Sequence, residues 1–144
     1  MSYDRADWHY GGNFPKDLPQ ENGGTHIGMF LAWIIMNDLE GEEHKEDCPE
    51  SLAAVRARLM TGRQFFFREC DGKFWETDLN EEGKAFAEHY YVGAERLYLK
   101  DYAQVFQDAV TLYHVADSWE NYDRIARIIT ERFEEWKETC RPAQ

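Results

Sequence analysis

The stretch THIGMFLAWIIMNDL, residues 25–39, predicts the centre of the fold. Thr25 belongs to the residue types that cap helices, so we expect a helix from Thr25 to about Leu39. Nearly the whole circumference of this helix is apolar, through Ile27, Met29, Phe30, Leu31, Ala32, Trp33, Ile34, Ile35 and Met36. A helix that is apolar all round is usually buried all round. We therefore predict a central helix around which the rest of the chain packs.

Length and composition indicate one domain with one hydrophobic core. The chain has 144 residues, of which 43% are hydrophobic and 15% aromatic, and large rings supply much buried surface per residue. We assign residues 1–144 to a single domain. Cys48, Cys70 and Cys140 are odd in number and far apart, which is typical of free thiols in a reducing compartment. Since no secretory signal is visible, the expected location is cytoplasmic.

Residues 1–22 are expected to form an irregular N-terminal arm packed on the core. Pro15 and Pro19 exclude a helix through this segment. Prolines and rings bury surface at a low ordering cost, so we expect the arm to be clamped across the helices by Trp8, Tyr10, Phe14 and Leu18. The same stretch, WHYGGNFPKDLP at residues 8–19, can instead form the wall of a ligand pocket.

The middle of the chain predicts a second helix and a β-hairpin. Pro49 suits the first turn of a helix over about 49–60, with an inner face formed by Leu52, Val55 and Leu59. RQFFFRECDGKFWETD, residues 63–78, is the clearest strand signal, because Asp71-Gly72 is a typical two-residue turn between aromatic-rich runs. Such a turn pairs Cys70 with Lys73, Arg68 with Trp75 and Phe66 with Thr77.

The last third of the chain predicts further helices. Asn80 can cap a short helix, residues 98–112 are weakly helical, and Ser118 begins the longest helix, which runs to about Glu138. One side of this helix is lined by Ile125, Ile129, Phe133 and Trp136. The predicted fold class is α+β: a mainly α-helical single domain with a central buried helix, a long C-terminal helix and a β-hairpin.

The formal net charge of −12 bears on the choice of partner. Such a surface disfavours nucleic acid and anionic lipid and attracts a basic protein, although solubility alone can also explain it. The longest apolar run, residues 29–36, is far too short to span a bilayer. The first candidate contact surface is an exposed loop, residues 38–50, with Glu40, Glu42, Glu43, Glu46 and Asp47. The second is the acidic face of the last helix, with Glu131, Glu134, Glu135 and Glu138. We expect the acids to be balanced within the fold by Arg56, Arg58, Arg63 and Arg68.

No residue pattern in the chain identifies a reaction. G-x-S-x-G, H-E-x-x-H and C-x-x-C are all absent, so we expect no catalytic residues, no cofactor and no tightly bound transition metal. His44 and Cys48, four residues apart, can hold a cation only weakly. The alternative to a binding protein is a small enzyme or ligand-binding domain. Its pocket would be formed by Trp8, His9, His26 and His114.

Four segments together resemble a family of small, acidic, uncharacterised bacterial proteins. They are YDRADWHYGGNFPKDLP at 3–19, THIGMFLAWII at 25–35, LNEEGKAFAEHYY at 79–91 and YHVADSWENYDRI at 113–125. That family looks like the immunity proteins found beside bacterial toxins, so the resemblance implies an interaction protein and supplies no catalytic residues. The expected function is therefore an acidic protein-binding module, an immunity protein or antitoxin that neutralises a basic toxin domain by occlusion. A homodimer that uses the aromatic surplus is a third interpretation.

Overall fold

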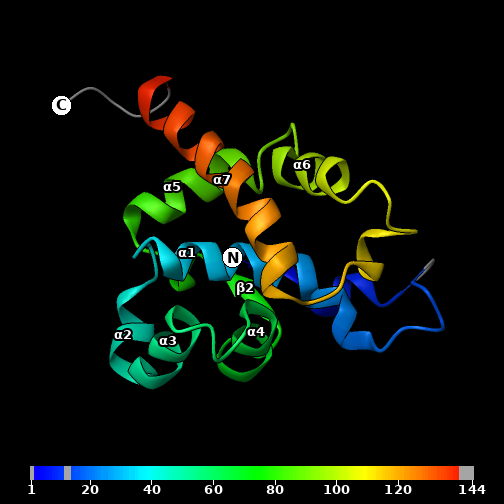
Figure 1. Cartoon of the computed structure of the whole chain (residues 1–144). Coiled ribbons are helices and arrows are strands. Elements are labelled where there is room, and N and C mark those ends of the chain that lie inside the picture. Colours follow the sequence, from blue (N-terminus) through cyan, green and yellow to red (C-terminus); the bar gives the residue numbers. More distant parts are fainter. Residues whose placement is uncertain (1, 12–13, 140–144) are drawn as a thin grey trace.

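The computed structural model describes residues 2–11 and 14–139. Within them, seven α-helices and a two-stranded antiparallel sheet form the fold (Figure 1). The helices are α1 (Thr25–Met36), α2 (Glu42–Asp47), α3 (Pro49–Arg56), α4 (Gly62–Glu69), α5 (Glu81–Tyr90), α6 (Leu97–Val105) and α7 (Trp119–Thr139). The strands are β1 (Ser2–Arg5) and β2 (Lys73–Trp75), and short 3₁₀ helices are η1 (Ala6–His9), η2 (Gln20–Gly24), η3 (Glu76–Asp78) and η4 (Leu112–His114). The predicted α+β class with mostly helices is confirmed.

Helix α1 is the buried central helix that the sequence predicts. Every residue from Thr25 to Ile35 is buried, and the helix packs against α3, α4 and α7 (Figure 1). Phe30 and Trp33 form the middle of an aromatic core. Their ring partners are Phe74, Phe86, Tyr90, Tyr91, Tyr98 and Phe133. These aromatic side chains therefore form one connected cluster around α1.

Two glycines bring α1 and α4 unusually close together. A Cβ atom at Gly62 would overlap the carbonyl group of Gly28, and a Cβ atom at Gly28 would overlap the backbone of Arg63. Only glycine allows this backbone separation. Helix α4 therefore lies directly on the central helix.

Residues 63–69 are helical, so the prediction of a strand in this stretch is wrong. The hydroxyl of Thr61 accepts a hydrogen bond from the backbone of Gln64, whose side chain accepts one from the backbone of Thr61. This capping box starts α4 and outweighs the strand preference of the aromatic run. The second predicted strand exists as β2, but its partner is β1, with Ser2 opposite Trp75. The expected pairing of Arg68 with Trp75 is therefore absent.

The N-terminal arm packs on the core through different residues from those predicted. It is not irregular throughout, because residues 2–9 form β1 and η1. Tyr3 and Ala6 are buried, whereas Trp8 is 59% exposed. The remaining predicted clamp residues are half-buried: Tyr10, Phe14 and Leu18. The prediction of a buried Trp8 is wrong, since the arm is fixed by its strand and not by this indole.

Helix α3 is shorter than predicted. It begins at Pro49 and ends at Arg56. Leu52 and Val55 are buried as expected, but Leu59 is 82% exposed because it lies beyond the end of the helix.

The later helices begin where the sequence indicates. The Asn80 side chain accepts a hydrogen bond from the backbone of Gly83 at 2.8 Å and caps α5. The hydroxyl of Ser118 accepts one from the backbone of Asn121 at 3.1 Å at the start of α7. The predicted inner face of α7 is buried, with Ile125, Ile129, Phe133 and Trp136.

The four arginines of residues 56–68 balance acidic side chains, as predicted. The pairs are Arg56–Asp38 at 3.0 Å, Arg58–Asp123 at 2.7 Å, Arg63–Asp117 at 3.3 Å and Arg68–Glu69 at 3.6 Å. Cys48 and Cys70 are free thiols, and Cys140 lies outside the described residues. Among the described helices, none is long and apolar enough to cross a bilayer.

Candidate functional site

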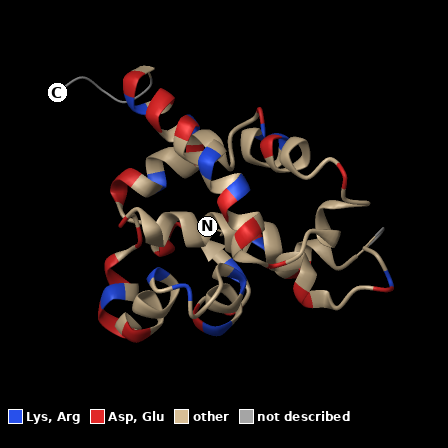
Figure 2. Cartoon of the chain, viewed as in Figure 1, with Lys and Arg blue, Asp and Glu red and all other residues tan. Residues whose placement is uncertain are grey.

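Helix α2 presents the acidic surface predicted for partner binding, although as a helix and not as an open loop. Its side chains Glu42, Glu43, Glu46 and Asp47 are exposed. In the part of the chain that the structure describes, only Glu42 of these has a cation partner, Lys45 at 3.3 Å. Segment 38–50 carries seven acidic residues and one lysine, and the acidic colour of α2 is visible in Figure 2. Uncompensated negative charge is therefore concentrated here.

Glu40 does not belong to this surface, so its predicted contact role is wrong. The residue is 1% exposed, and its carboxylate pairs with the guanidinium of Arg56. It also forms a β-bridge with Leu79. Glu40 thus fixes the start of the acidic segment to the body of the domain.

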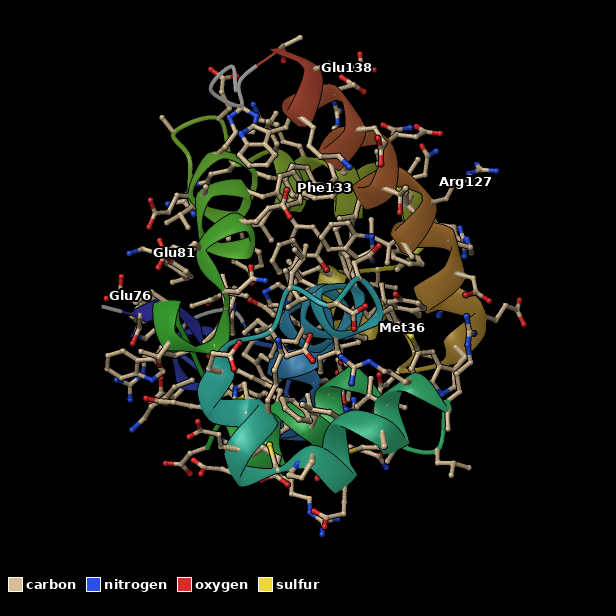
Figure 3. The ribbon with its side chains drawn as sticks, turned by 90° about the vertical axis from the view of Figure 1, so that its left-hand side faces the viewer. Met36, Glu76, Glu81, Arg127, Phe133 and Glu138 are labelled. Carbon is tan, nitrogen blue, oxygen red and sulfur yellow. The ribbon has the colours of Figure 1, made fainter. Side chains whose placement is uncertain are left out.

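The second predicted surface, on α7, is exposed but more mixed in charge. Its acidic side chains face solvent at Glu131, Glu134, Glu135 and Glu138. Glu134 pairs with Lys137 at 3.4 Å, and basic bands interrupt the acidic ones along this helix (Figure 2). Helix α2 and the C-terminal half of α7 lie at opposite ends of the molecule (Figures 1 and 3). The two surfaces are therefore alternatives and not one interface.

The structure brings together two of the four residues predicted for a histidine pocket. The ring centroids of His9 and His26 are 4.6 Å apart. Trp8 is exposed instead. The ring of His114 contacts the hydroxyl of Thr111 at 2.8 Å and lies 3.8 Å from Asp17. The centre of interest is therefore the pair His9 and His26.

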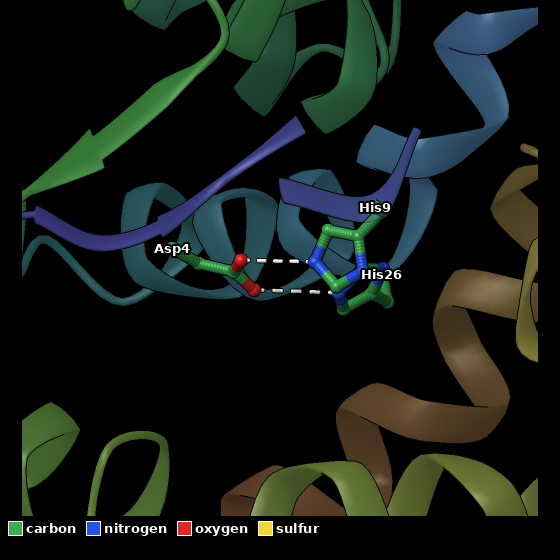
Figure 4. A group of neighbouring side chains, drawn as sticks. All are labelled: Asp4, His9 and His26. Atoms are coloured by element: carbon green, nitrogen blue, oxygen red, sulfur yellow. Dashed lines mark hydrogen bonds and ion pairs between the residues drawn. The ribbon is translucent and has the colours of Figure 1, made fainter. Parts of the chain in front are cut away.

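A buried carboxylate joins these two histidines (Figure 4). Nε2 of His9 lies 2.9 Å from Oδ1 of Asp4, and Nε2 of His26 lies 3.4 Å from Oδ2. The hydroxyl of Tyr91 donates to Oδ2 at 2.6 Å, and the backbone N–H of Arg5 donates to Oδ1 at 2.8 Å. Strand β1, η1, α1 and the end of α5 thus converge on one carboxylate, which we call the Asp4 centre (Asp4, His9 and His26).

The surroundings decide the charge of the Asp4 centre. Burial alone would raise the pKa of the Asp4 carboxyl, but the contacts from His26 and His9 hold this pKa below its usual value. Burial lowers the pKa of His26 despite the neighbouring carboxylate. Burial, followed by the charge of Asp4, raises the pKa of Tyr91 well above its usual value. At neutral pH the centre therefore contains an ionised carboxylate beside a neutral imidazole and a neutral phenol.

His26 is the one residue of the Asp4 centre whose hydrogen bonding is incomplete. It is fully buried, and among the described residues neither of its ring nitrogens has a hydrogen-bond partner. Its Nε2 is within ion-pair reach of Asp4 but is not aligned for a hydrogen bond. His9, in contrast, also contacts the hydroxyl of Tyr113 through Nδ1 at 2.8 Å. Buried polar atoms without partners are rare and destabilising.

A second cluster joins α2 to η3. Nε2 of His44 lies 2.8 Å from Oδ1 of Asp78, and Sγ of Cys70 lies 3.7 Å from the same oxygen. On the other side of the ring, Sγ of Cys48 lies 3.7 Å from Nδ1 of His44. Burial raises the pKa of Cys70 well above its usual value and, with Glu69 nearby, raises the pKa of Cys48 to about 11. The thiols are therefore protonated at neutral pH, and each group of this cluster has a partner.

An open groove of about 840 Å³ lies beside α4. Its apolar lining comes from Tyr10, Leu59, Met60 and Phe67, and its polar lining from Glu21, Arg63, Gln64 and Arg68. Tyr10 gives the N-terminal arm a place in this wall, but none of the four residues predicted for the histidine pocket lines the groove. The Asp4 centre does not line this groove.

Sequence reasoning did not find Asp4, Tyr91 or Asp78. No motif of known chemistry includes them, and the hydrogen bond between Tyr91 and Asp4 spans 87 positions of sequence. Only the folded chain brings such residues together. His9 and His26, in contrast, stand out because they lie among aromatic and apolar neighbours.

Comparison with known proteins gives one family match. The model of a domain of unknown function, DUF7832, matches residues 2–115. This range contains the Asp4 centre and the second cluster, formed by His44, Cys48, Cys70 and Asp78, whereas α7 follows the range. No curated protein and no solved structure matches the chain.

Proposed function

Since the chain belongs to the DUF7832 family, whose function is unknown, we infer its role from its own surface and propose that it is an acidic protein-binding module. One observation carries the proposal. Glu43, Glu46 and Asp47 are exposed on α2 and have no cation partner within the described residues. A basic protein surface would neutralise them. Such complementary charge steers the encounter of two proteins and selects the partner.

An exposed aromatic residue is linked to this acidic helix through Asp78. Trp75 is 38% exposed, and its backbone N–H donates to Oδ2 of Asp78 at 2.7 Å. The other oxygen of Asp78 contacts His44 of α2 at 2.8 Å. Protein interfaces typically combine a few aromatic anchors with a charged rim. In the proposal, Trp75 is the anchor and the α2 carboxylates form the rim.

The four sequence segments resemble an uncharacterised family that in turn looks like immunity proteins, and this suggests the kind of partner. We take it to be the basic catalytic domain of a bacterial toxin, met in the cytoplasm. The mechanism is stoichiometric: the bound domain covers the toxin's cationic cleft and leaves no room for its substrate. Nucleic acid and membrane are not partners in this proposal, because the net charge of −12 repels their phosphates.

The test begins with the capture of partners by the tagged full-length chain and continues with binding kinetics. Glu43→Lys/Glu46→Lys reverses two unpaired charges of α2. Glu135→Lys/Glu138→Lys makes the same change of net charge at the opposite end of the molecule and serves as the matched control. The α2 variant should associate several-fold more slowly at low salt, because rim charges act mainly on encounter. The difference should shrink near 0.5 M salt, where the Debye length is roughly 4 Å.

Three outcomes contradict the α2 interface. The α2 variant can associate at the wild-type rate, both variants can slow equally, or the α7 variant alone can slow. Equal slowing means that only net charge acts, and the last result moves the interface to α7. Trp75→Ala should leave the association rate nearly unchanged and increase the dissociation rate, which tests the anchor separately. Circular dichroism and thermal melts confirm that each variant is folded.

A further inference from the structure

The Asp4 centre has the side chains and the spacing of a metal site (Figure 4). We propose that Asp4, His9 and His26 bind a divalent first-row transition-metal ion. The proposal is independent of the acidic α2 surface. It departs from the expectation drawn from the sequence, which showed no closed set of metal ligands.

The distances fit a small ion. One donor atom from each of the three residues lies within 4.8 Å of the others. A tetrahedral ion with bonds of about 2.0–2.1 Å to nitrogen and oxygen holds its ligands roughly 3.3 Å apart. In the Asp4 centre, Nε2 of His9 lies 2.9 Å from Oδ1 of the carboxylate, and Nε2 of His26 lies 3.4 Å from Oδ2. Coordination therefore requires only small side-chain movements.

His26 supplies an independent reason. Its ring is fully buried, and neither nitrogen has a hydrogen-bond partner among the residues described. The carboxylate faces Nε2 but accepts no aligned hydrogen bond from it. A metal ion would bind the lone pair of Nε2. The carboxylate of Asp4 would at the same time neutralise part of the charge of the ion. The structure thus contains a buried imidazole nitrogen, Nε2 of His26, that a cation would satisfy.

The neighbouring tyrosines are placed as metal sites usually place their outer partners. A histidine ligand commonly engages an oxygen through its second nitrogen, which fixes the ring. Nδ1 of His9 contacts the hydroxyl of Tyr113 at 2.8 Å. The hydroxyl of Tyr91 donates to the Asp4 carboxylate at 2.6 Å and orients it in the same way. His9 and Asp4 are therefore held in position before any ion binds.

The donor set limits the class of ion. Two imidazoles and one carboxylate suit Zn²⁺, Fe²⁺, Co²⁺ and similar ions better than Mg²⁺ or Ca²⁺, which prefer oxygen alone. Three protein ligands leave at least one position for water or another small molecule.

The experiment uses the full-length chain, freed of metal by a chelator and titrated with Co²⁺ and Zn²⁺. We expect one equivalent to bind, with the visible absorption of Co²⁺ in a nitrogen and oxygen site and no thiolate-to-cobalt charge-transfer band. His26→Gln and His9→Gln should lower the Zn²⁺ affinity by more than the roughly 10–100-fold typical of a lost outer-shell partner. His9 lies partly at the surface, so its variant should fold even if the buried His26 variant does not.

Two controls separate this centre from other metal-binding groups. His114→Gln removes a histidine outside the centre and should leave the affinity unchanged. Cys70→Ser disables the cluster of His44, Cys70 and Asp78, whose donor atoms also lie within 4.8 Å of one another. The proposal is overturned if wild-type protein binds neither ion at micromolar concentrations, or if binding survives in His9→Gln. It is also overturned if a thiolate band appears and Cys70→Ser abolishes binding.

Discussion

Two tryptophans make a direct test of the packing described above. Trp33 of α1 is 1% exposed and Trp8 of the arm is 59% exposed. A large aromatic side chain buries about 150–250 Å², which at about 25 cal/mol per Å² is worth roughly 4–6 kcal/mol when burial is complete. Scaled to its buried two-fifths or so, Trp8 is worth roughly 1.5–2.5 kcal/mol. Both figures are upper bounds, because unfolded chains already bury some surface.

The expected losses of unfolding free energy are therefore clearly different. Trp33→Ala should lose about 3–5 kcal/mol, the usual cost of emptying a large aromatic site. The indole N–H of Trp33 donates to the hydroxyl of Thr130 at 3.0 Å, but Thr130 is exposed and can bond to water in the variant. This hydrogen bond should therefore add little. Trp8→Ala should lose about 1–2 kcal/mol, since most of its ring already faces solvent.

Urea unfolding at one temperature and pH measures both losses, with the m-value as a check that the unfolded state is unchanged. Equal losses in the two variants would refute the assignment of Trp8 to the surface. They would support instead the clamp that the sequence suggested, in which Trp8 is buried against the helices. A Trp33→Ala loss below about 2 kcal/mol would refute the central place of α1, because that cost is the lower limit for a large core side chain.

Two further predictions follow from the backbone contact and from the buried carboxylate. In thermal melts, Gly62→Ala should destabilise the protein by about 1–3 kcal/mol, as overpacking usually does, because its Cβ would overlap the Gly28 carbonyl. Gly11→Ala is the control: the new atom meets open space, so the stability should change by less than about 0.5 kcal/mol. Asp4 has a pKa below its usual value of about 3.9 in the folded state, so its stabilising contribution is complete above that pH and is lost as the pH falls below it. The stability difference between wild type and Asp4→Asn, followed by urea titration from pH 7 to pH 3, should be constant above about pH 4 and shrink below it; a difference that grows on acidification contradicts the ionised state of Asp4.

The sequence predicted the helical elements well where one local signal acted alone. The uninterrupted apolar run of α1, the cap at Asn80 and the periodic apolar face of α7 each identify a helix from a few neighbouring residues. The prediction failed at residues 63–69, where two local signals competed. The aromatic run and the Asp71-Gly72 turn favoured a hairpin, but the capping box of Thr61 and Gln64 started a helix. The strand partner of β2 lay some seventy positions away, beyond the reach of any local rule.

The candidate sites show the same limit. Exposure of the acidic side chains on α2 and α7 was predictable from charge alone, because unpaired carboxylates avoid the core. Glu40 was the exception, since burial requires a partner, and Arg56 could be matched to it only in three dimensions. The meeting of His9 with His26 was open at the level of sequence. Asp4 was not predictable, because nothing in its neighbours along the chain distinguishes this buried carboxylate from those that lie at the surface.

The N-terminal arm now has a physical explanation that its own composition does not supply. Pairing of β1 with β2 fixes Asp4 opposite Phe74, and η1 then turns the chain so that His9 returns to the same carboxylate. The partner of this pair, His26, comes from the first turn of the most deeply buried helix. A two-stranded sheet is too small to be stable alone, but here it is held by the core on one side and by the Asp4 centre on the other. The residues that fix the arm are therefore also the residues that form the centre, so a metal ion bound there, as proposed above, would also stabilise the arm.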